Sequence, residues 1–188
     1  FIFYELLTII TYPLVSHGGD NNSKLMARKY IIVLISTSML LFLPAIFILY
    51  HFTGDISFKL IPNEITSISK GAFNLILLML IFGCAKAAVM PFHIWLPAAM
   101  VAPIPVSALL HAVAVVKSGL FIIISIIFYI FGIENIKNNI ITIYGYNIMT
   151  WLFVITVVIS STTAIFQTNI KKLLAYSTIS QLSYSLIS

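Results

Sequence analysis

The sequence has 188 residues, of which 61% are hydrophobic and only 8% are charged, and its formal net charge is +5. Soluble globular domains carry about 25% charged residues, so this composition excludes a water-soluble protein. The basic residues are scattered between apolar runs of bilayer length, which argues against a nucleic-acid partner. We therefore expect an all-α, multi-pass protein that is integral to a lipid bilayer.

Six segments are predicted to lie in the membrane: 1–15, 30–50, 72–101, 105–131, 148–166, and one that starts at 173. A straight crossing of the hydrocarbon core takes about 20 residues. The third segment is longer than that, and Pro91 removes a backbone hydrogen-bond donor inside it. We therefore expect two half-helices with a break near Pro91. The chain begins at Phe1 and no basic region precedes its first apolar run, so we expect a piece of a longer protein rather than a signal peptide.

Basic residues in the connections predict the orientation. The first, third and fifth connections share one side of the membrane, and the second and fourth share the other. The first group carries Lys24, Arg28, Lys29, Lys171 and Lys172, and the second carries Lys59, Lys70 and Lys137. Because cytoplasmic loops are enriched in Lys and Arg, the first group is expected on the cytoplasmic side.

Four titratable residues fall within the apolar segments: Glu5, Lys86, Lys117 and His111. An intramembrane charge costs at least ~2.5–3.5 kcal/mol, and such residues usually face protein or water and mark ion pathways. Lys86 and Lys117 lie well inside their segments, which favours a function over snorkelling to an interface. An ion pair that only fixes helix packing remains the alternative for Glu5, which shares a helical face with Thr8 and Tyr12.

Lys86 has an unusual sequence context, "GCAKAAVMPFHIWLPAAM". Small neighbours let other helices approach closely, and Pro91 opens the helix soon after the lysine. Broken helices of this kind form the ion sites of transporters near the midplane of the bilayer, whereas a plain proline kink is the simpler alternative. His93 follows the break and has either a proton role or an interfacial position.

The fourth segment places Ser107, His111 and Ser118 on one face, with Lys117 about 120° around the helix. No pattern predicts a metal site, a cofactor site or bond chemistry in this chain. Whether the chain belongs to an enzyme complex therefore depends on its partners.

The motif "AKAAVMPFHIWLPAAMVAPIPVSALLHAVAVVKSGLF" (85–121) resembles the signature region of the antiporter-like subunits. These are the large proton-conducting membrane subunits shared by respiratory complex I (NADH–quinone oxidoreductase) and the Mrp cation/proton antiporters. "FYELLTIITYPLV" (3–15) is similar to their fifth transmembrane helix, and "NIKKLLAYSTISQLSY" (169–184) to the start of their tenth.

The resemblance implies a fragment of a fourteen-helix fold with two inverted five-helix repeats. Residues 1–131 would form most of the first repeat, and 148–188 the start of the second. It also implies proton transfer by Glu5, Lys86, His111 and Lys117. The relatives often have an acid after "WLP", where this sequence has Ala98. The pair of His111 and Lys117 fits the Mrp subunits somewhat better, and both subgroups stay open.

The resemblance implies other membrane subunits as partners and protons as cargo, with sodium left open. It also implies a bacterial cytoplasmic membrane or a mitochondrial-type inner membrane. The hypothesis is a switchable Glu5–Lys86 ion pair that drives protons towards His111 or Lys117. Pro91 and His93 would serve the broken helix or proton access. The alternatives are a non-conducting structural subunit of such a complex and an unrelated membrane transferase built around His93.

Overall fold

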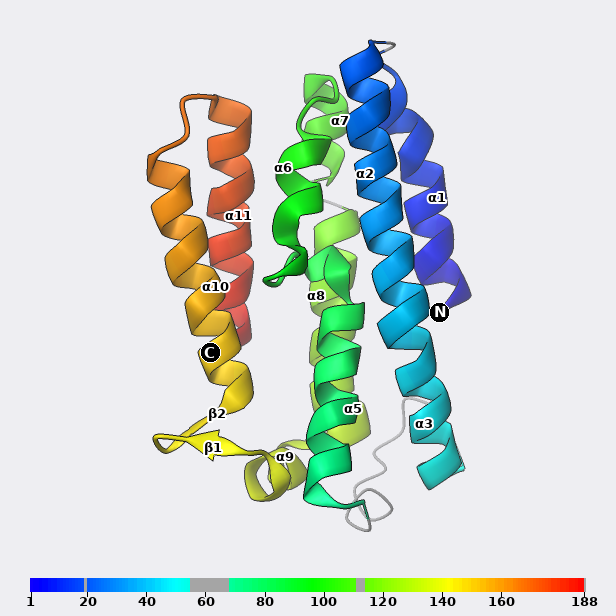
Figure 1. The fold of residues 1–188 in the computed structure, drawn as a ribbon, viewed down its shortest axis with the longest axis vertical. Helices are drawn as coiled ribbons and strands as arrows, with labels where there is room; N and C mark the ends of the chain where they lie inside the picture. Colours follow the sequence, from blue (N-terminus) through cyan, green and yellow to red (C-terminus); the bar gives the residue numbers. More distant parts are fainter. Residues whose placement is uncertain (19, 55–67, 111–113, 188) are drawn as a thin grey trace.

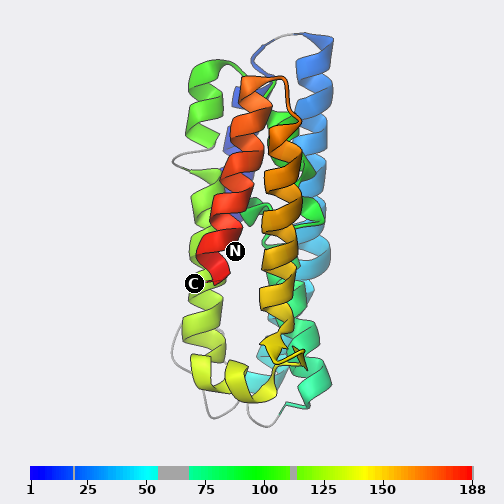
Figure 2. The same ribbon diagram turned by 90° about the vertical axis from the view of Figure 1, so that its left-hand side faces the viewer.

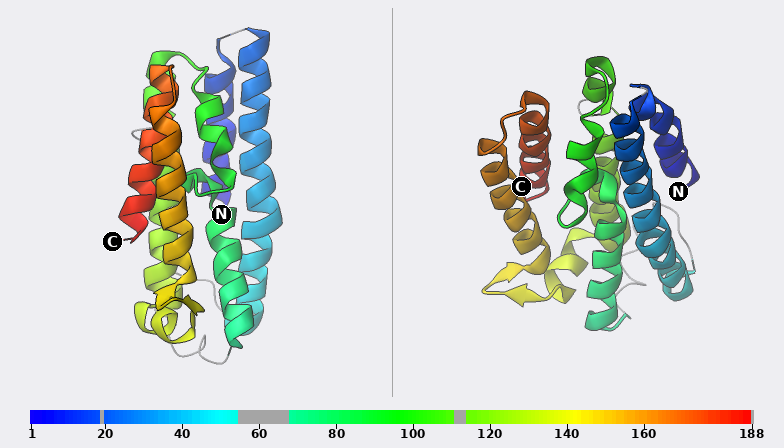
Figure 3. Two further views of the ribbon diagram at one scale, coloured as in Figure 1. Left: turned by 60° about the vertical axis from the view of Figure 1, so that its left-hand side comes forward. Right: turned by 45° about the horizontal axis from the view of Figure 1, so that its top comes forward.

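The computed structural model describes residues 1–18, 20–54, 68–110 and 114–187, and it is an elongated helical bundle. Figure 1 shows α1, α2 and α3 along one side and the α10–α11 pair along the other, with α5, α6 and α8 between them. Both views in Figure 3 agree that α10 and α11 lie side by side. The expectation of a mainly helical protein is met, with one short hairpin as the exception.

The first side consists of an antiparallel helix pair that packs closely. Its elements are α1 (Ile2–Ser16), α2 (Asn21–Thr37), a π-helical turn (Ser38–Phe42) and α3 (Leu43–Thr53). Pro44 lies in the first turn of α3, where its missing N–H and bulky ring are accommodated by the wider π turn before it. Gly54, with φ 69°, adopts the left-handed conformation that ends α3.

The central part is a helix that stops and resumes. It comprises α5 (Lys70–Gly83), 3₁₀ turns at Ala85–Ala87 and Phe92–Ile94, α6 (Trp95–Ala99) and α7 (Ile104–Ala108). Regular helix ends at Gly83, well before Pro91. In Figure 1, α5 lies below and α6 above, with the irregular segment between them at mid-height.

The remaining elements return along the bundle. They are α8 (Val115–Ser125), a π-helical stretch (Ile126–Phe131), α9 (Ile133–Asn139), β1 (Thr142–Ile143), β2 (Tyr146–Asn147), α10 (Ile148–Ile165) and α11 (Ile170–Ile187). Gly132 (φ 71°) turns the chain into α9. Tyr144 and Gly145, both with positive φ, form the two-residue turn of the antiparallel hairpin.

Two described helices are long and apolar enough to cross a membrane, Ser23–Thr53 and Ile148–Ile165. A third is gained if Val115–Phe131 and Ile133–Asn139, which meet at 80°, count as one span. Ile2–Ser16 and Lys70–Gly83 are apolar but shorter. The predicted segments 30–50 and 148–166 thus coincide with clear spans, whereas the full count of six is not established by length and composition.

The connections between the helices lie at the two ends of the bundle. The α1–α2, α6–α7 and α10–α11 connections lie at one end, and α9 with the hairpin lies at the other (Figures 1 and 2). Lys24, Lys171 and Lys172 therefore belong to the same end of the molecule. The long connection before α5 was predicted to carry Lys59, and that residue lies outside the described residues.

The interior contains two apolar clusters that meet at the irregular segment. One includes Cys84 and Ala87 and extends towards α3 and α9. The other includes Ala85 and Ala88 and extends towards α2, α6 and α11. The turn that carries Lys86 therefore lies between the two clusters.

The backbone of α8 passes very close to the irregular segment at Gly119. A Cβ atom built on Gly119 would lie 2.6 Å from the carbonyl carbon of Lys86 and 3.0 Å from the Cα of Ala87. Real Cβ atoms do not approach backbone this closely, so only glycine fits here. This contact fixes the depth at which Lys86 is held.

Gly119→Ala is expected to destabilise the complete protein by about 1–3 kcal/mol, because the added methyl group overpacks rigid backbone. Gly71→Ala is the matched control, since nothing lies within 4 Å of a Cβ at Gly71 near the start of α5. Thermal unfolding in detergent measures both. Equal stability of the two variants would contradict the close approach described here.

Candidate functional site

Lys86 is fully buried, with 0% of its surface exposed, in the 3₁₀ turn Ala85–Ala87. Its ammonium donates a hydrogen bond to the backbone carbonyl of Tyr4 in α1. The same Nζ lies 3.4 Å from the centroid of the Tyr4 ring, which is a cation–π geometry. The charge is therefore held by one residue of α1 through both its carbonyl and its ring.

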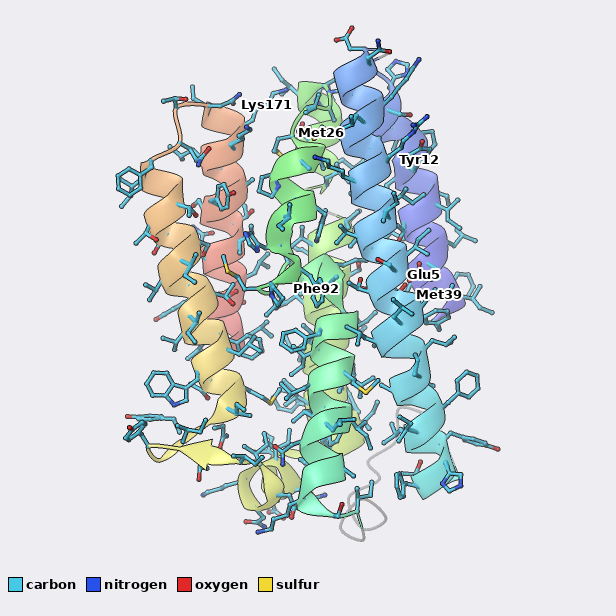
Figure 4. The ribbon with its side chains drawn as sticks, in the orientation of Figure 1. Glu5, Tyr12, Met26, Met39, Phe92 and Lys171 are labelled. Atoms are coloured by element: carbon cyan, nitrogen blue, oxygen red, sulfur yellow. The ribbon has the colours of Figure 1, made fainter. Side chains whose placement is uncertain are left out.

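Glu5 follows Tyr4 and is 7% exposed. Its carboxylate interacts electrostatically with Lys86, Cys84 and Tyr30, so it faces the irregular segment and α2. Neither carboxylate oxygen accepts a hydrogen bond. The structure thus brings the two predicted partners together, but Lys86 is bonded to the carbonyl next to Glu5 rather than to Glu5 itself. Figure 4 shows Glu5 at about mid-height of the bundle.

The irregular backbone around Lys86 satisfies its polar groups through side chains from other elements. The Trp95 Nε1–H donates to the Ala85 carbonyl at 2.7 Å, and the Met90 N–H donates to the Thr156 hydroxyl at 3.4 Å. Unwound backbone at membrane depth is tolerated only where such partners or water are present. These contacts stabilise the segment in its non-helical conformation.

Trp95 is the residue of this site that sequence inspection missed. It is fully buried, and its ring packs edge-on against Tyr30 at 5.5 Å. Tyr30 in turn shares a hydrogen bond of 2.6 Å with the Thr11 hydroxyl. A signal was present, because a buried tryptophan needs a partner for its N–H and the unwound segment nearby offers free carbonyls.

Pro91 and His93 follow the 3₁₀ turn that carries Lys86. Pro91 is exposed and lines a cavity of about 210 Å³ together with Lys29 and Trp95. The half-buried His93 ring faces Tyr176 of α11, with centroids 6.3 Å apart, and its Nδ1 has no hydrogen-bond partner. His93 therefore packs against α11.

Of the two other predicted relay residues, the structure describes only Lys117. Lys117 is exposed on α8, two positions before the Gly119 contact, and is therefore not part of the buried cluster. His111 lies outside the described residues. Within the ranges that the structure describes, no group of three His, Cys, Asp or Glu side chains is placed to hold a metal ion.

Trp95→Phe is expected to destabilise the protein by about 1–3 kcal/mol, because the buried Ala85 carbonyl loses its donor while the ring volume is largely kept. Trp151→Phe is the matched control: Trp151 is 37% exposed, and its Nε1–H donates to the Ile143 carbonyl at 2.9 Å. Water can replace that bond, so a smaller loss is expected. Comparing the unfolding midpoints of the two variants tests this, and a larger loss at Trp151 would contradict it.

Comparisons with known proteins identify the family of this chain. The family model described as NADH:quinone oxidoreductase/Mrp antiporter, TM, matches residues 1–188. A Staphylococcus epidermidis protein named as an antiporter subunit, mnhA2, is 36% identical over 97% of this chain and 22% of its own length. NAD(P)H-quinone oxidoreductase subunit 5 of Lotus japonicus chloroplasts is 34% identical over the whole chain and 25% of its own length.

Two solved structures share the fold. One is the Mrp complex from Dietzia sp. DQ12-45-1b, with a TM-score of 0.76 and 26% identity over 99% of this chain and 20% of that one. The other is the membrane-bound sulfane sulfur reductase, an archaeal respiratory membrane complex, with a TM-score of 0.78 and 26% identity over 99% and 37%. The chain spans about a quarter of the length of its curated relatives. It is an integral membrane protein of the NADH:quinone oxidoreductase/Mrp antiporter family.

Proposed function

We propose that this chain is the proton-translocating part of an antiporter-like membrane subunit, and that Glu5 and Lys86 are its central proton-carrying pair. One observation carries the proposal. A fully buried lysine lies on unwound backbone beside a buried carboxylate that accepts no hydrogen bond. Intramembrane charges in such settings mark ion pathways, and half-helices around a break form transporter ion sites.

The proposed mechanism is a change of partner at Lys86. In the arrangement described above, the ammonium is bonded to the Tyr4 carbonyl and Glu5 is unpaired. A shift of Lys86 towards Glu5 would close the ion pair and favour the charged lysine, because an opposite charge nearby stabilises it. Opening the pair in an apolar interior would favour proton release. The buried position between two apolar clusters makes both effects large.

The released proton is proposed to pass towards His111 and Lys117. Lys117 lies on the exposed face of α8, so its place in the path comes after transfer out of the buried cluster. Pro91 and His93 are proposed to give access at the break, where the cavity beside Pro91 lies. Support for these roles comes from the family resemblance and from the positions of Pro91, His93 and Lys117.

The family resemblance also supports a proposal for the architecture, the partners and the cargo. Six membrane crossings, with the third broken near Pro91, accommodate the described helices. Residues 1–131 would form most of the first inverted repeat, and 148–188 the start of the second. Other membrane subunits are the proposed partners, and the cargo is the proton, with sodium as a further cation. The relatives include both Mrp and quinone oxidoreductase subunits, so either a bacterial cytoplasmic or a mitochondrial-type inner membrane fits.

Glu5→Gln and Lys86→Ala are each expected to abolish proton transport by the complete complex in membrane vesicles. The glutamine keeps the shape of Glu5 but cannot carry a proton, and the alanine removes the buried ammonium. Glu134→Gln in α9 is the matched control, because Glu134 is exposed and away from the cluster. Assembly of the complex is measured in parallel.

Unchanged transport in Glu5→Gln would refute the proposed function. A structural role alone makes a different prediction. If the charges only fix helix packing, replacing Glu5 and Lys86 together with apolar residues of similar size would preserve transport, because a buried pair replaced by apolar side chains is often neutral for stability.

A further inference from the structure

Thr8 is completely buried in α1, yet its hydroxyl has no hydrogen-bond partner. A helical threonine normally donates to the carbonyl three or four residues earlier. The other buried threonines of the described chain do so: the Thr11 hydroxyl donates to Leu7, that of Thr37 to Val33 and that of Thr156 to Leu152, each at 2.8 Å. Thr8 is therefore the exception among them.

The reason is visible at the residue four positions before Thr8, which is Tyr4. The Tyr4 carbonyl accepts the hydrogen bond of the Lys86 ammonium. Lys86 thus occupies the place that the Thr8 hydroxyl would take in an ordinary helix. A carbonyl oxygen has two lone pairs, and the helix backbone already uses one, so the two donors compete for the same site.

The free hydroxyl of Thr8 lies on the same helical face as Glu5, three residues away. Both the Thr8 hydroxyl and the Glu5 carboxylate are buried and unpaired. An unpaired buried carboxylate is costly, and one water molecule between the hydroxyl and the carboxylate would give both groups a partner. Val15, seven residues further along the same face, is also fully buried, so this face of α1 lies in the interior as far as the end of the helix.

We propose that Thr8 is a positioning residue that exchanges hydrogen-bond partners with Lys86. While Lys86 is bonded to the Tyr4 carbonyl, the Thr8 hydroxyl stabilises the Glu5 carboxylate through one bridging water molecule. When Lys86 pairs with Glu5, the Thr8 hydroxyl rotates onto the vacated Tyr4 carbonyl, as the other buried threonines do on theirs. Every polar group then has a partner in both states, which lowers the barrier between them. This inference rests on the proposed function of Glu5 and Lys86.

Thr8→Val keeps the shape of the side chain but removes the hydroxyl. It is expected to lower proton transport by the complete complex about tenfold, the effect of one lost hydrogen bond. Thr8→Ser should restore most of the rate. Thr37→Val is the matched control, because Thr37 is buried and its hydroxyl bonds only to carbonyls of its own helix, α2. Its transport should equal that of the wild type.

An infrared measurement separates positioning from mere packing. The carboxylate band that disappears in Glu5→Gln should shift in Thr8→Val and stay in place in Thr8→Ser and Thr37→Val. Should Thr8→Val fail to assemble, Thr8→Cys replaces it with the same expectation, since a thiol of similar size is a weak donor.

The outcomes distinguish the two proposals. Normal transport and an unshifted band in Thr8→Val, together with an inactive Glu5→Gln, would overturn the role of Thr8 and leave the proposed function intact. Normal transport in both variants would overturn the proposed function itself. A loss in Thr8→Val that serine fails to restore, without a band shift, would reduce Thr8 to a packing residue.

Discussion

The burial of the Lys86 ammonium is the constraint on which the rest of this structure depends. A full charge in an apolar interior costs several kcal/mol, about 2.5–3.5 at the least. Three features offset that cost: the Tyr4 carbonyl, the Tyr4 ring and the nearby carboxylate of Glu5. The carbonyl can reach the lysine only because the helix has already ended at Gly83 and the backbone of Gly119 holds the turn in place.

The roles of Glu5 and Lys86 stay a prediction, but the sequence was sufficient to predict the helical membrane class, an interruption of the third segment and the packing of both charges among helices. These follow from composition and from the cost of intramembrane charge, which are local properties. The end of regular helix at Gly83 was not predictable from Pro91, because the contacts of Trp95 and Gly119 that favour the unwound turn come from other parts of the fold. The exposed position of Lys117 likewise depends on which face of α8 meets the turn at Gly119.

Contacts from distant parts of the chain hold the region between Met90 and Ala102. Met90 bonds to Thr156 in α10, and His93 packs against Tyr176 in α11. The Lys171 ammonium donates to the Ala102 carbonyl at 2.9 Å, and Figure 4 shows Lys171 at the α10–α11 end of the bundle. The α10–α11 pair therefore contacts the irregular segment directly. A rearrangement at Lys86 would change contacts on both sides of the bundle.

The shortness of α5 has a consequence for how the chain enters the bilayer. Its 14 residues extend only about 21 Å at 1.5 Å per residue, whereas the hydrocarbon core is about 30 Å thick. An insertion machinery that reads one apolar helix at a time would find this segment too short on its own. Gly119 of α8 docks against the turn after α5, so this contact forms only after the lysine has been synthesised, whereas Tyr4 and Glu5 of α1 precede the lysine in the chain.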